Sequence, residues 1–226
     1  MDFDIKYVKA LQVLDSRGDP TVEVIVVTEG GGVGRAIAPA GASRGRLEAV
    51  DLRDGGKAYG GRGVRKAVEA VNKYIAPAIK GMDSSKYHEV DRKIIEIDGT
   101  ANKSRLGGNA TTATSLAVVN AAADTAGVPL FEFLGGCRAR TLPTPLMNII
   151  NGGAHAGNEL SIQEFMIVPV GADSFSEAIK IAVEVYKTLK NILKESYGAS
   201  AINVGDEGGF APPIKKTEEA VKVMVK

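Results

Sequence analysis

The amino-acid sequence predicts an α/β fold in two parts: an α+β domain over residues 1–136 and the first part of a β/α barrel over residues 137–226. Three observations carry this prediction. The first forty residues hold three runs rich in Val and Ile, separated by turn residues, as in a meander of antiparallel strands. Helical periodicity follows. The remaining residues then return to strand patterns before a last helix.

Composition narrows the class of protein. The chain has 226 residues, 44% hydrophobic and 24% charged, as in an ordinary globular protein of one or two domains. Its net charge of +1 gives no reason to expect nucleic acid as a partner. No apolar run approaches the ~20 residues of a membrane span, and the N-terminus lacks the apolar segment of a secretory signal. The single Cys137 favours a reducing compartment, so we expect a soluble cytoplasmic protein.

The N-terminal strands are predicted from the segment IKYVKALQVLDSRGDPTVEVIVVTEGGGVGRAIA. The turn clusters DSRGDP and EGGG divide it into three runs that are apolar or alternate between apolar and polar residues. This segment therefore predicts a three-stranded antiparallel meander.

Three helices are predicted between residues 64 and 127. In the first, Val64 to Ile79, apolar residues recur three or four positions apart, and the second runs from Tyr87 to Ile97. The third is a run of small Ala, Thr, Ser and Val residues, with Asn109 as the expected N-cap and Gly127 as the expected end. Side chains this small would let neighbouring elements pack closely.

A new pair of strands is predicted after an extended linker that contains Pro143 and Pro145. The apolar runs 146–150 and 165–170 are joined by the loop NGGAHAGNELSIQE, which shows no helical pattern. Because a parallel pair needs a long crossover connection, usually a helix, we expect these two strands to be antiparallel.

The rest of this region contains helix, strand and helix patterns. Ser174 and Glu177 match a capping box that opens a helix ending at Gly198. The run SAINV, residues 200–204, is the next expected strand, and TEEAVKVMVK is a helix pattern still running at residue 226. A closed barrel takes ~200 residues or more, so this region is either a small open sheet or part of a barrel. The end inside a helix pattern favours a truncated barrel.

Two glycine-rich loops carry polar residues suited to ligand binding. The loop APAGASRG holds Ser43 and could swing as a lid, although it also suits a plain surface loop after the third strand. The loop NGGAHAGN leaves His155 approachable as an acid, a base or a phosphate partner. The other histidine, His88, lies in a polar helical segment and is expected to be solvated.

Acidic residues lie at two loop–strand boundaries. Gln163 and Glu164 directly precede the second strand of the pair, so antiparallel pairing would place Glu164 at the same sheet end as His155. Barrel enzymes carry their active sites at that end. Asp206 and Glu207 complete the set; paired carboxylates can hold a proton between them, and their oxygens suit Mg²⁺. Each of these acids alone would equally suit a solvated turn.

One expectation conflicts with this grouping. A single helix from Ser174 to Tyr197 would return the chain to the face where it started, so that Asp206 and Glu207 would point away from Glu164. Only a break of that segment into two helices would bring the acids together.

Four stretches, in order, resemble the successive signatures of the enolase family: LDSRGDPTVEV, APAGASRG, NGGAHAGNELSIQEFMIVP and NVGDEGGFAPP. They cover Leu14 to Pro213. The resemblance implies an α+β N-terminal domain and a barrel that begins β-β-α-α, which would supply the antiparallel strand and the helix break. It also implies Mg²⁺-dependent, reversible dehydration of 2-phospho-D-glycerate to phosphoenolpyruvate, a glycolytic and gluconeogenic reaction on a phosphorylated small molecule, usually by a homodimer or higher homo-oligomer.

The same resemblance implies roles for single residues. Glu164 and Glu207 would be the catalytic acidic pair at the leaving hydroxyl, with Glu207 the better candidate for general acid. His155 would close over the substrate near its phosphate, as both a catalytic and a substrate-binding residue. Gln163 and Glu164 would also contact the substrate, and Ser43 would bind a second Mg²⁺.

The sequence departs from the family pattern in three ways. Asp19 stands where asparagine is commoner, and the loop reads PAGASRG, with Ala40 and Arg44, where PSGASTG is usual. The family's principal Mg²⁺ ligands, its lysine base and its phosphate-binding arginine all lie beyond residue 226. The sequence is therefore expected to be the N-terminal half of an enolase, inactive alone; the alternative is a truncated fragment with an assembly or binding role.

Overall fold

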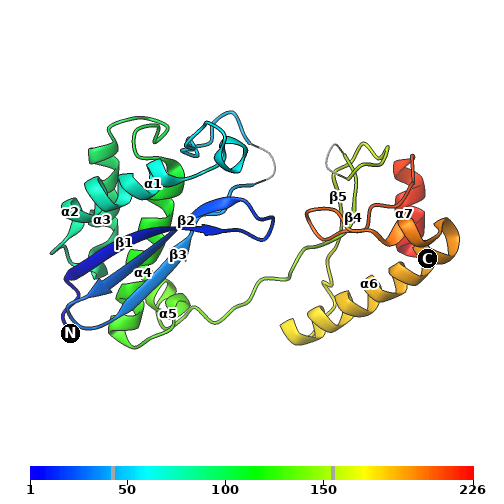
Figure 1. The fold of residues 1–226 in the computed structure, drawn as a ribbon. Coiled ribbons are helices and arrows are strands. Elements are labelled where there is room, and N and C mark those ends of the chain that lie inside the picture. The colour runs from blue at the N-terminus through cyan, green and yellow to red at the C-terminus, as the bar shows by residue number, and fades with distance from the viewer. Residues whose placement is uncertain (42–43, 154–155) are drawn as a thin grey trace. The chain divides into compact units, whose positions relative to one another are not determined.

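A computed structural model describes residues 1–41, 44–153 and 156–226. The chain forms two compact units, Met1–Ala139 and Arg140–Lys226. Figure 1 shows an antiparallel sheet with helices in the first unit and two strands with helices in the second. This confirms the predicted fold class, an α+β domain followed by the start of an unclosed barrel. Among the described residues, no helix is both long and apolar enough to cross a membrane.

The sheet of the first unit is the predicted meander. β1 (Ile5–Leu14), β2 (Pro20–Thr28) and β3 (Val33–Ile37) pair antiparallel in the order β1-β2-β3. Side chains alternate between the faces of a strand, and every second residue of β2 from Val22 to Val26 faces the core, fully buried. The central strand thus contributes fully buried side chains to the core of this unit.

Helices follow the sheet in chain order. They are η1 (Ala58–Gly61), α1 (Arg65–Ala70), the π-helical turn η2 (Val71–Ile75), α2 (Ala76–Ile79), η3 (Ser84–Lys86), α3 (Tyr87–Asp98), α4 (Gly108–Ala126) and α5 (Leu130–Gly135). The three predicted helices are present, and Gly127 ends α4 in the left-handed conformation, with a φ of +68°. The expected N-cap was wrong: Gly107 caps α4, because the Asn109 side chain bonds the backbone of Leu52 instead.

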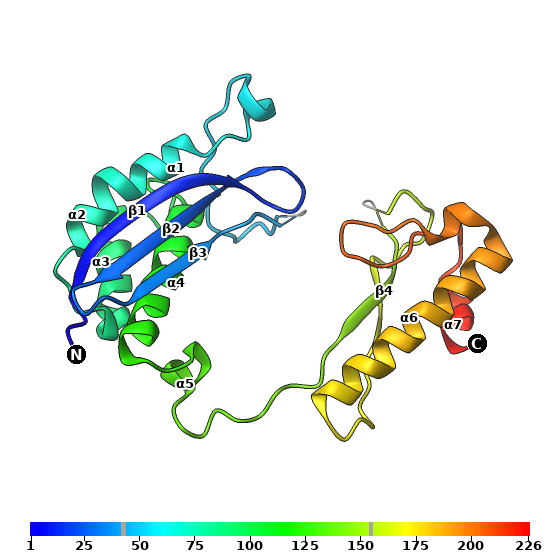
Figure 2. The same cartoon turned by 60° about the horizontal axis from the view of Figure 1, so that its bottom comes forward.

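The small residues of α4 let it touch the sheet backbone, as predicted. Figures 1 and 2 show α4 running along one face of the sheet. A Cβ added to Gly34 of β3 would lie only 2.0 Å from the Ala117 carbonyl oxygen and 2.3 Å from the Ala121 nitrogen. Only glycine fits at this crossing, and a close backbone approach is the reason for it.

Asp98, buried at the end of α3, makes the stability of the first unit depend on pH. Burial acts to raise the pKa of its carboxyl, but hydrogen bonds from the Thr100 hydroxyl and from the backbone N–H groups of Leu106 and Thr100 outweigh it, so the pKa lies below its usual value. A lowered pKa in the folded state adds stability that is present above the ordinary value of 3.8 and is lost as the pH falls through the folded value.

We expect Asp98→Asn to lower the unfolding free energy at pH 7 by about 1–3 kcal/mol, because its amide cannot accept all of these hydrogen bonds. The difference from the wild type should shrink as the pH falls below 3.8, where the wild-type carboxyl itself gains a proton. Urea denaturation followed by circular dichroism at several pH values measures both effects. A difference that stays constant down to the acid end would contradict this role of Asp98.

The second unit contains β4 (Met147–Asn151), β5 (Glu164–Ile167), α6 (Phe175–Tyr197), η4 (Ala199–Ile202) and α7 (Thr217–Val225). β4 and β5 pair antiparallel, as predicted, and the order is β-β-α-α. Ser174 caps α6 by accepting a hydrogen bond from the Glu177 N–H at 3.1 Å. The apolar stripe of α6 covers the strands through Leu189 and Leu193, which belong to a core with Ile149, Ile150 and Phe210.

Two expectations for this unit were wrong. SAINV is not a strand: its first residues form η4, and only Val204 makes an isolated bridge, to Phe210. The segment Ser174–Tyr197 does not break, since α6 is one continuous helix. The chain runs along β4, back along β5 and forward again along α6, and these three passes leave residue 197 at the carboxyl end of β4. Asp206 and Glu207 therefore follow on the required side without a break.

Candidate active site

The candidate active site lies where β4 ends, β5 begins and a hairpin made by residues 203–211 returns to the sheet. Asn151, the last residue of β4, lies opposite Glu164, the first residue of β5. The hairpin bonds to β4 through Phe210, whose N–H donates to the Ile149 oxygen at 2.9 Å and whose oxygen accepts from the Asn151 N–H at 2.8 Å. Three segments far apart in the sequence thus meet at one sheet end.

A β-bulge in β4 decides which side chains face this site. Asn148 pairs with Met166 and Ile150 with Phe165, so Ile149 is an extra residue in the ladder. Residues three apart on a regular strand point to opposite faces, whereas a bulge reverses the alternation. The bulge brings Asn148 and Asn151 into contact, and the Asn148 Nδ2 donates to the Asn151 Oδ1 at 3.1 Å.

Glu207 is held by both of its carboxylate oxygens. The Asn151 Nδ2 donates to Oε2 at 2.8 Å, and the Gln163 Nε2 donates to Oε1 at 2.7 Å. The Glu207 side chain is exposed, and each oxygen keeps a second lone pair for water, a proton or a ligand. The carboxylate is therefore fixed in direction yet open to a ligand.

The glycines around Glu207 allow the hairpin to approach β4. A Cβ on Gly209 would lie 2.6 Å from the Asn151 Oδ1, and Gly208 has a φ of +80°, a conformation that favours glycine. The hairpin also packs against α6, because Tyr186 of α6 stacks on Phe210 with ring centroids 4.3 Å apart. The Tyr186 hydroxyl donates to the Gly208 oxygen at 2.9 Å, and burial raises the pKa of this phenol.

The predicted site residues fall into three groups. Glu207, Gln163 and Glu164 come together at one sheet end, as expected. Asp206 does not contribute to that group: it is exposed and lines a separate cavity of about 480 Å³, whose lining includes residues 156–159, 203–205 and 213–215. Ser43 and His155 lie outside the described residues.

Two asparagines escaped the sequence prediction. Asn151 and Asn148 lie in the segment MNIIN, which was interpreted only as an apolar strand. The signal that indicates them is a polar residue at each end of the buried Ile149–Ile150 pair. Their placement depends on the bulge, which periodicity does not show.

Within residues 1–41, 44–153 and 156–226, no group of three or more His, Cys, Asp or Glu side chains is arranged to hold a metal ion.

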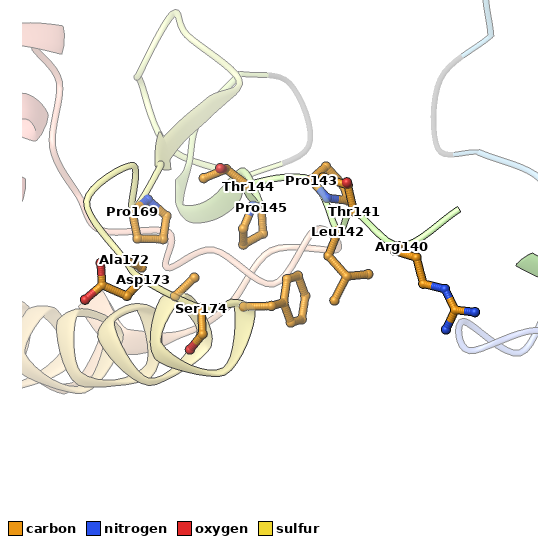
Figure 3. Close-up of a pocket in the computed structure, with 12 residues that line it drawn as sticks. Arg140, Thr141, Leu142, Pro143, Thr144, Pro145, Pro169, Ala172, Asp173 and Ser174 are labelled. Carbon is orange, nitrogen blue, oxygen red and sulfur yellow. The ribbon is translucent and has the colours of Figure 1, made fainter. Parts of the chain in front are cut away.

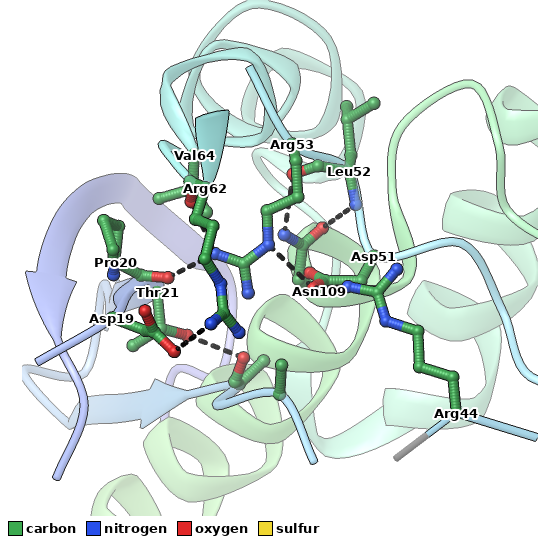
Figure 4. Close-up of polar contacts among 12 residues, drawn as sticks. Asp19, Pro20, Thr21, Arg44, Asp51, Leu52, Arg53, Arg62, Val64 and Asn109 are labelled. Carbon is green, nitrogen blue, oxygen red and sulfur yellow. Dashed lines mark hydrogen bonds and ion pairs between the residues drawn. The ribbon is translucent and has the colours of Figure 1, made fainter. Parts of the chain in front are cut away.

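Figure 4 shows a polar network that includes Asp19, Arg44, Asp51, Arg53 and Arg62. Asp51 accepts hydrogen bonds from Arg53 at 2.7 Å and from Arg44 at 2.8 Å. Asp19 pairs with Arg62 at 2.9 Å. Two residues that depart from the family pattern, Asp19 and Arg44, therefore each gain an ion pair in this structure.

A second cavity, of about 410 Å³, lies at the amino end of β4. Figure 3 shows its lining, the extended segment 140–145 above the first turn of α6 together with Pro169 and Ala172. None of the predicted catalytic residues lines it, so we do not assign it to the candidate active site.

Comparison with known proteins gives two family matches and several close relatives. Residues 5–134 match the family described as enolase, N-terminal domain, and residues 139–226 match enolase, C-terminal TIM barrel domain. The chain is 59% identical over 224 residues to a protein named enolase from Aeropyrum pernix and 57% identical over 222 residues to one from Methanocaldococcus jannaschii. These alignments cover 99% and 98% of this chain but 52% of each relative, so the chain spans about half their length.

Proposed function

Because the chain belongs to the enolase family, we propose that it supplies the N-terminal half of a lyase, a phosphopyruvate hydratase that converts 2-phospho-D-glycerate reversibly to phosphoenolpyruvate. The observation that supports this most directly is the Glu207 carboxylate, fixed by the Asn151 and Gln163 amides at the sheet end where β5 begins with Glu164.

The proposed chemistry for Glu207 follows from the leaving group. Dehydration breaks a carbon–oxygen bond, and hydroxide leaves poorly unless it receives a proton as the bond breaks. A carboxyl group held at a fixed position can deliver that proton, and general acid catalysis of this kind contributes about 10²- to 10⁴-fold to a rate. In our proposal Glu207 is the proton donor, Glu164 assists at the same hydroxyl, and Gln163 contacts the substrate.

Three further roles stay proposals that rest on the family resemblance. His155 would close near the substrate phosphate, and Ser43 would provide one Mg²⁺ ligand. Mg²⁺, where bound, stabilises the negative charge that develops on the substrate. Its main ligands, with the base that removes the substrate proton, would come from beyond residue 226.

A homodimer or higher homo-oligomer in the cytoplasm is part of the same proposal. The outer face of the three-stranded sheet supports a self-association surface, because Tyr7 and Leu11 of β1 and Val33 and Ile37 of β3 leave 42–51% of their surface exposed. Large exposed apolar patches often mark protein–protein contacts. Light scattering during size-exclusion chromatography measures the oligomeric state.

The test of the proposed function uses a complete chain, in which residues 1–226 are followed by the rest of the barrel. We expect this complete chain to form phosphoenolpyruvate from 2-phosphoglycerate when Mg²⁺ is present, and residues 1–226 alone to form none. A folded complete chain without turnover would overturn the lyase proposal. Turnover by residues 1–226 alone would show that the base and the metal ligands do not lie beyond residue 226.

A second candidate function is a fragment that binds or assembles without catalysis. The exposed apolar side chains on the outer face of the three-stranded sheet are the observation that would support it. Retention of turnover by the complete chain would favour the lyase, because selection for a binding role alone would not preserve the geometry around Glu207.

A further inference from the structure

Asn151 is the best-fixed polar side chain of the candidate site. It is the last residue of β4 and is 4% exposed, whereas Glu207 and Gln163 are both exposed. Its side chain makes three hydrogen bonds, to groups on two different segments. A buried amide with this many partners is held in one orientation.

The direction of the Asn151 amide is determined by its oxygen. Oδ1 accepts the Gly209 N–H at 2.8 Å and the Asn148 Nδ2 at 3.1 Å. Both partners face Oδ1 as donors, because the Gly209 backbone N–H can only donate and Asn148 uses its own oxygen to accept the Phe165 N–H at 3.3 Å. Flipping the Asn151 amide would set donors against donors. Its Nδ2 must therefore face Glu207.

Two local features support this arrangement. The bulge at Ile149 turns Asn148 and Asn151 toward each other, at the cost of a regular strand ladder. Gly209 leaves the space next to Oδ1 that any Cβ would fill. Bulges and close backbone approaches are common beside active sites, where they aim a side chain.

We infer that Asn151 is a positioning residue, which aims the Glu207 carboxyl at the leaving hydroxyl while Gln163, exposed on the other oxygen, is free to exchange its contact when the substrate enters. The inference rests on the proposed function. Asn151 does not touch the substrate itself and acts through Glu207.

Asn151→Asp in the complete chain tests this role. The new side chain has the shape of the old one and keeps an acceptor for Gly209 and Asn148, but it presents an oxygen to the Glu207 Oε2. Loss of the Nδ2 donor that holds Oε2 leaves the Glu207 carboxyl without its fixed direction, which should lower kcat by about 10- to 100-fold. KM should change by less than about threefold, because the substrate contacts stay in place.

A double-mutant cycle separates positioning from a merely structural effect. In Glu207→Gln, the new amide can donate to an aspartate at position 151, so adding Asn151→Asp should cost less than about twofold in the residual turnover. The thermal unfolding midpoint gives a second readout: Asn151→Asp should lower it, and Glu207→Gln should restore part of the loss. The matched control is Asn72→Asp in the other unit, since the Asn72 side chain bonds the Ala10 backbone, at 2.9 and 3.2 Å.

We expect Asn151→Asp to lower kcat in the wild-type background but not in the Glu207→Gln background. The control Asn72→Asp should lower stability and leave kcat unchanged. A kcat within twofold of the wild type for Asn151→Asp would overturn the inference, as would equal losses in both backgrounds. If the wild-type complete chain shows no turnover, the proposed function fails; the unfolding midpoints then still test the coupling between Asn151 and Glu207.

Discussion

Replacing Glu207 with Gln in the complete chain is expected to lower the turnover of 2-phosphoglycerate by about 10²- to 10⁴-fold, the usual contribution of a general acid. Glutamine has nearly the same shape and can still accept one amide hydrogen bond, but it has no proton to give to the leaving hydroxide. Gln163 is exposed and can turn its amide toward the new partner, so the fold should be retained. Initial rates and circular dichroism measure the two effects.

The matched control for this substitution is Asp206→Asn. Asp206 is the neighbouring carboxylate, but it lines the separate cavity beside residues 156–159. Its replacement should leave turnover within about twofold of the wild type. Near-normal turnover in Glu207→Gln, or an equal loss in Asp206→Asn, would remove Glu207 from the role that we propose.

The largest expected effect on stability comes from Gly34→Ala in β3. The added Cβ would overlap the Ala117 carbonyl oxygen and the Ala121 nitrogen of α4, at 2.0 and 2.3 Å. Both obstacles are backbone, so the helix as a whole must move away from the sheet. We expect a loss of about 3 kcal/mol of unfolding free energy, the upper part of the range for overpacked cores. Denaturant unfolding of the first unit measures it.

The control for this prediction is Gly45→Ala. A Cβ on Gly45 would meet only the flexible Glu48 side chain, at 3.4 Å or more. Its effect should stay within about 0.5 kcal/mol, as for an ordinary surface substitution. Equal stabilities of the two variants would mean that α4 does not rest on the sheet backbone.

Local patterns in the sequence predicted most of the fold. The valines of β2 and the small residues of α4 identified those two elements, and the apolar stripe of α6 identified both the helix and its inner side. The antiparallel pairing of β4 with β5 followed from the lack of a helical pattern in the connection between them. These inferences succeeded because each depends on neighbours in the sequence.

The failures depend on contacts between distant residues. SAINV has the composition of a strand, but Phe210 takes the place beside Ile150 that such a strand would occupy. Asn109 is a good N-cap by type, yet its side chain is used to hold the backbone of Leu52. No break in α6 is needed, because the passes along β4, β5 and α6 already bring the chain to the carboxyl end of β4.

In the candidate site, too, some residues were predicted from local patterns, and others were missed because their placement depends on the paired strand. Gln163 and Glu164 were predicted from their position at the start of β5, whereas Glu207 was predicted from the end of SAINV, which is not a strand. Asn151 and Asn148 were missed because an extra residue in β4 reverses the alternation that a strand pattern assumes. The residue that holds Glu207 was therefore less visible in the sequence than Glu207 itself.

The most direct measurement follows two steps of the reaction separately in Glu207→Gln and in the wild-type complete chain: formation of phosphoenolpyruvate, and exchange of the hydrogen on the carbon next to the substrate carboxylate with deuterated water. If Glu207 gives its proton to the leaving hydroxide, the variant should lose product formation while hydrogen exchange continues, because a different residue removes that hydrogen. Equal loss of both steps in a folded variant, or of neither, would contradict the account.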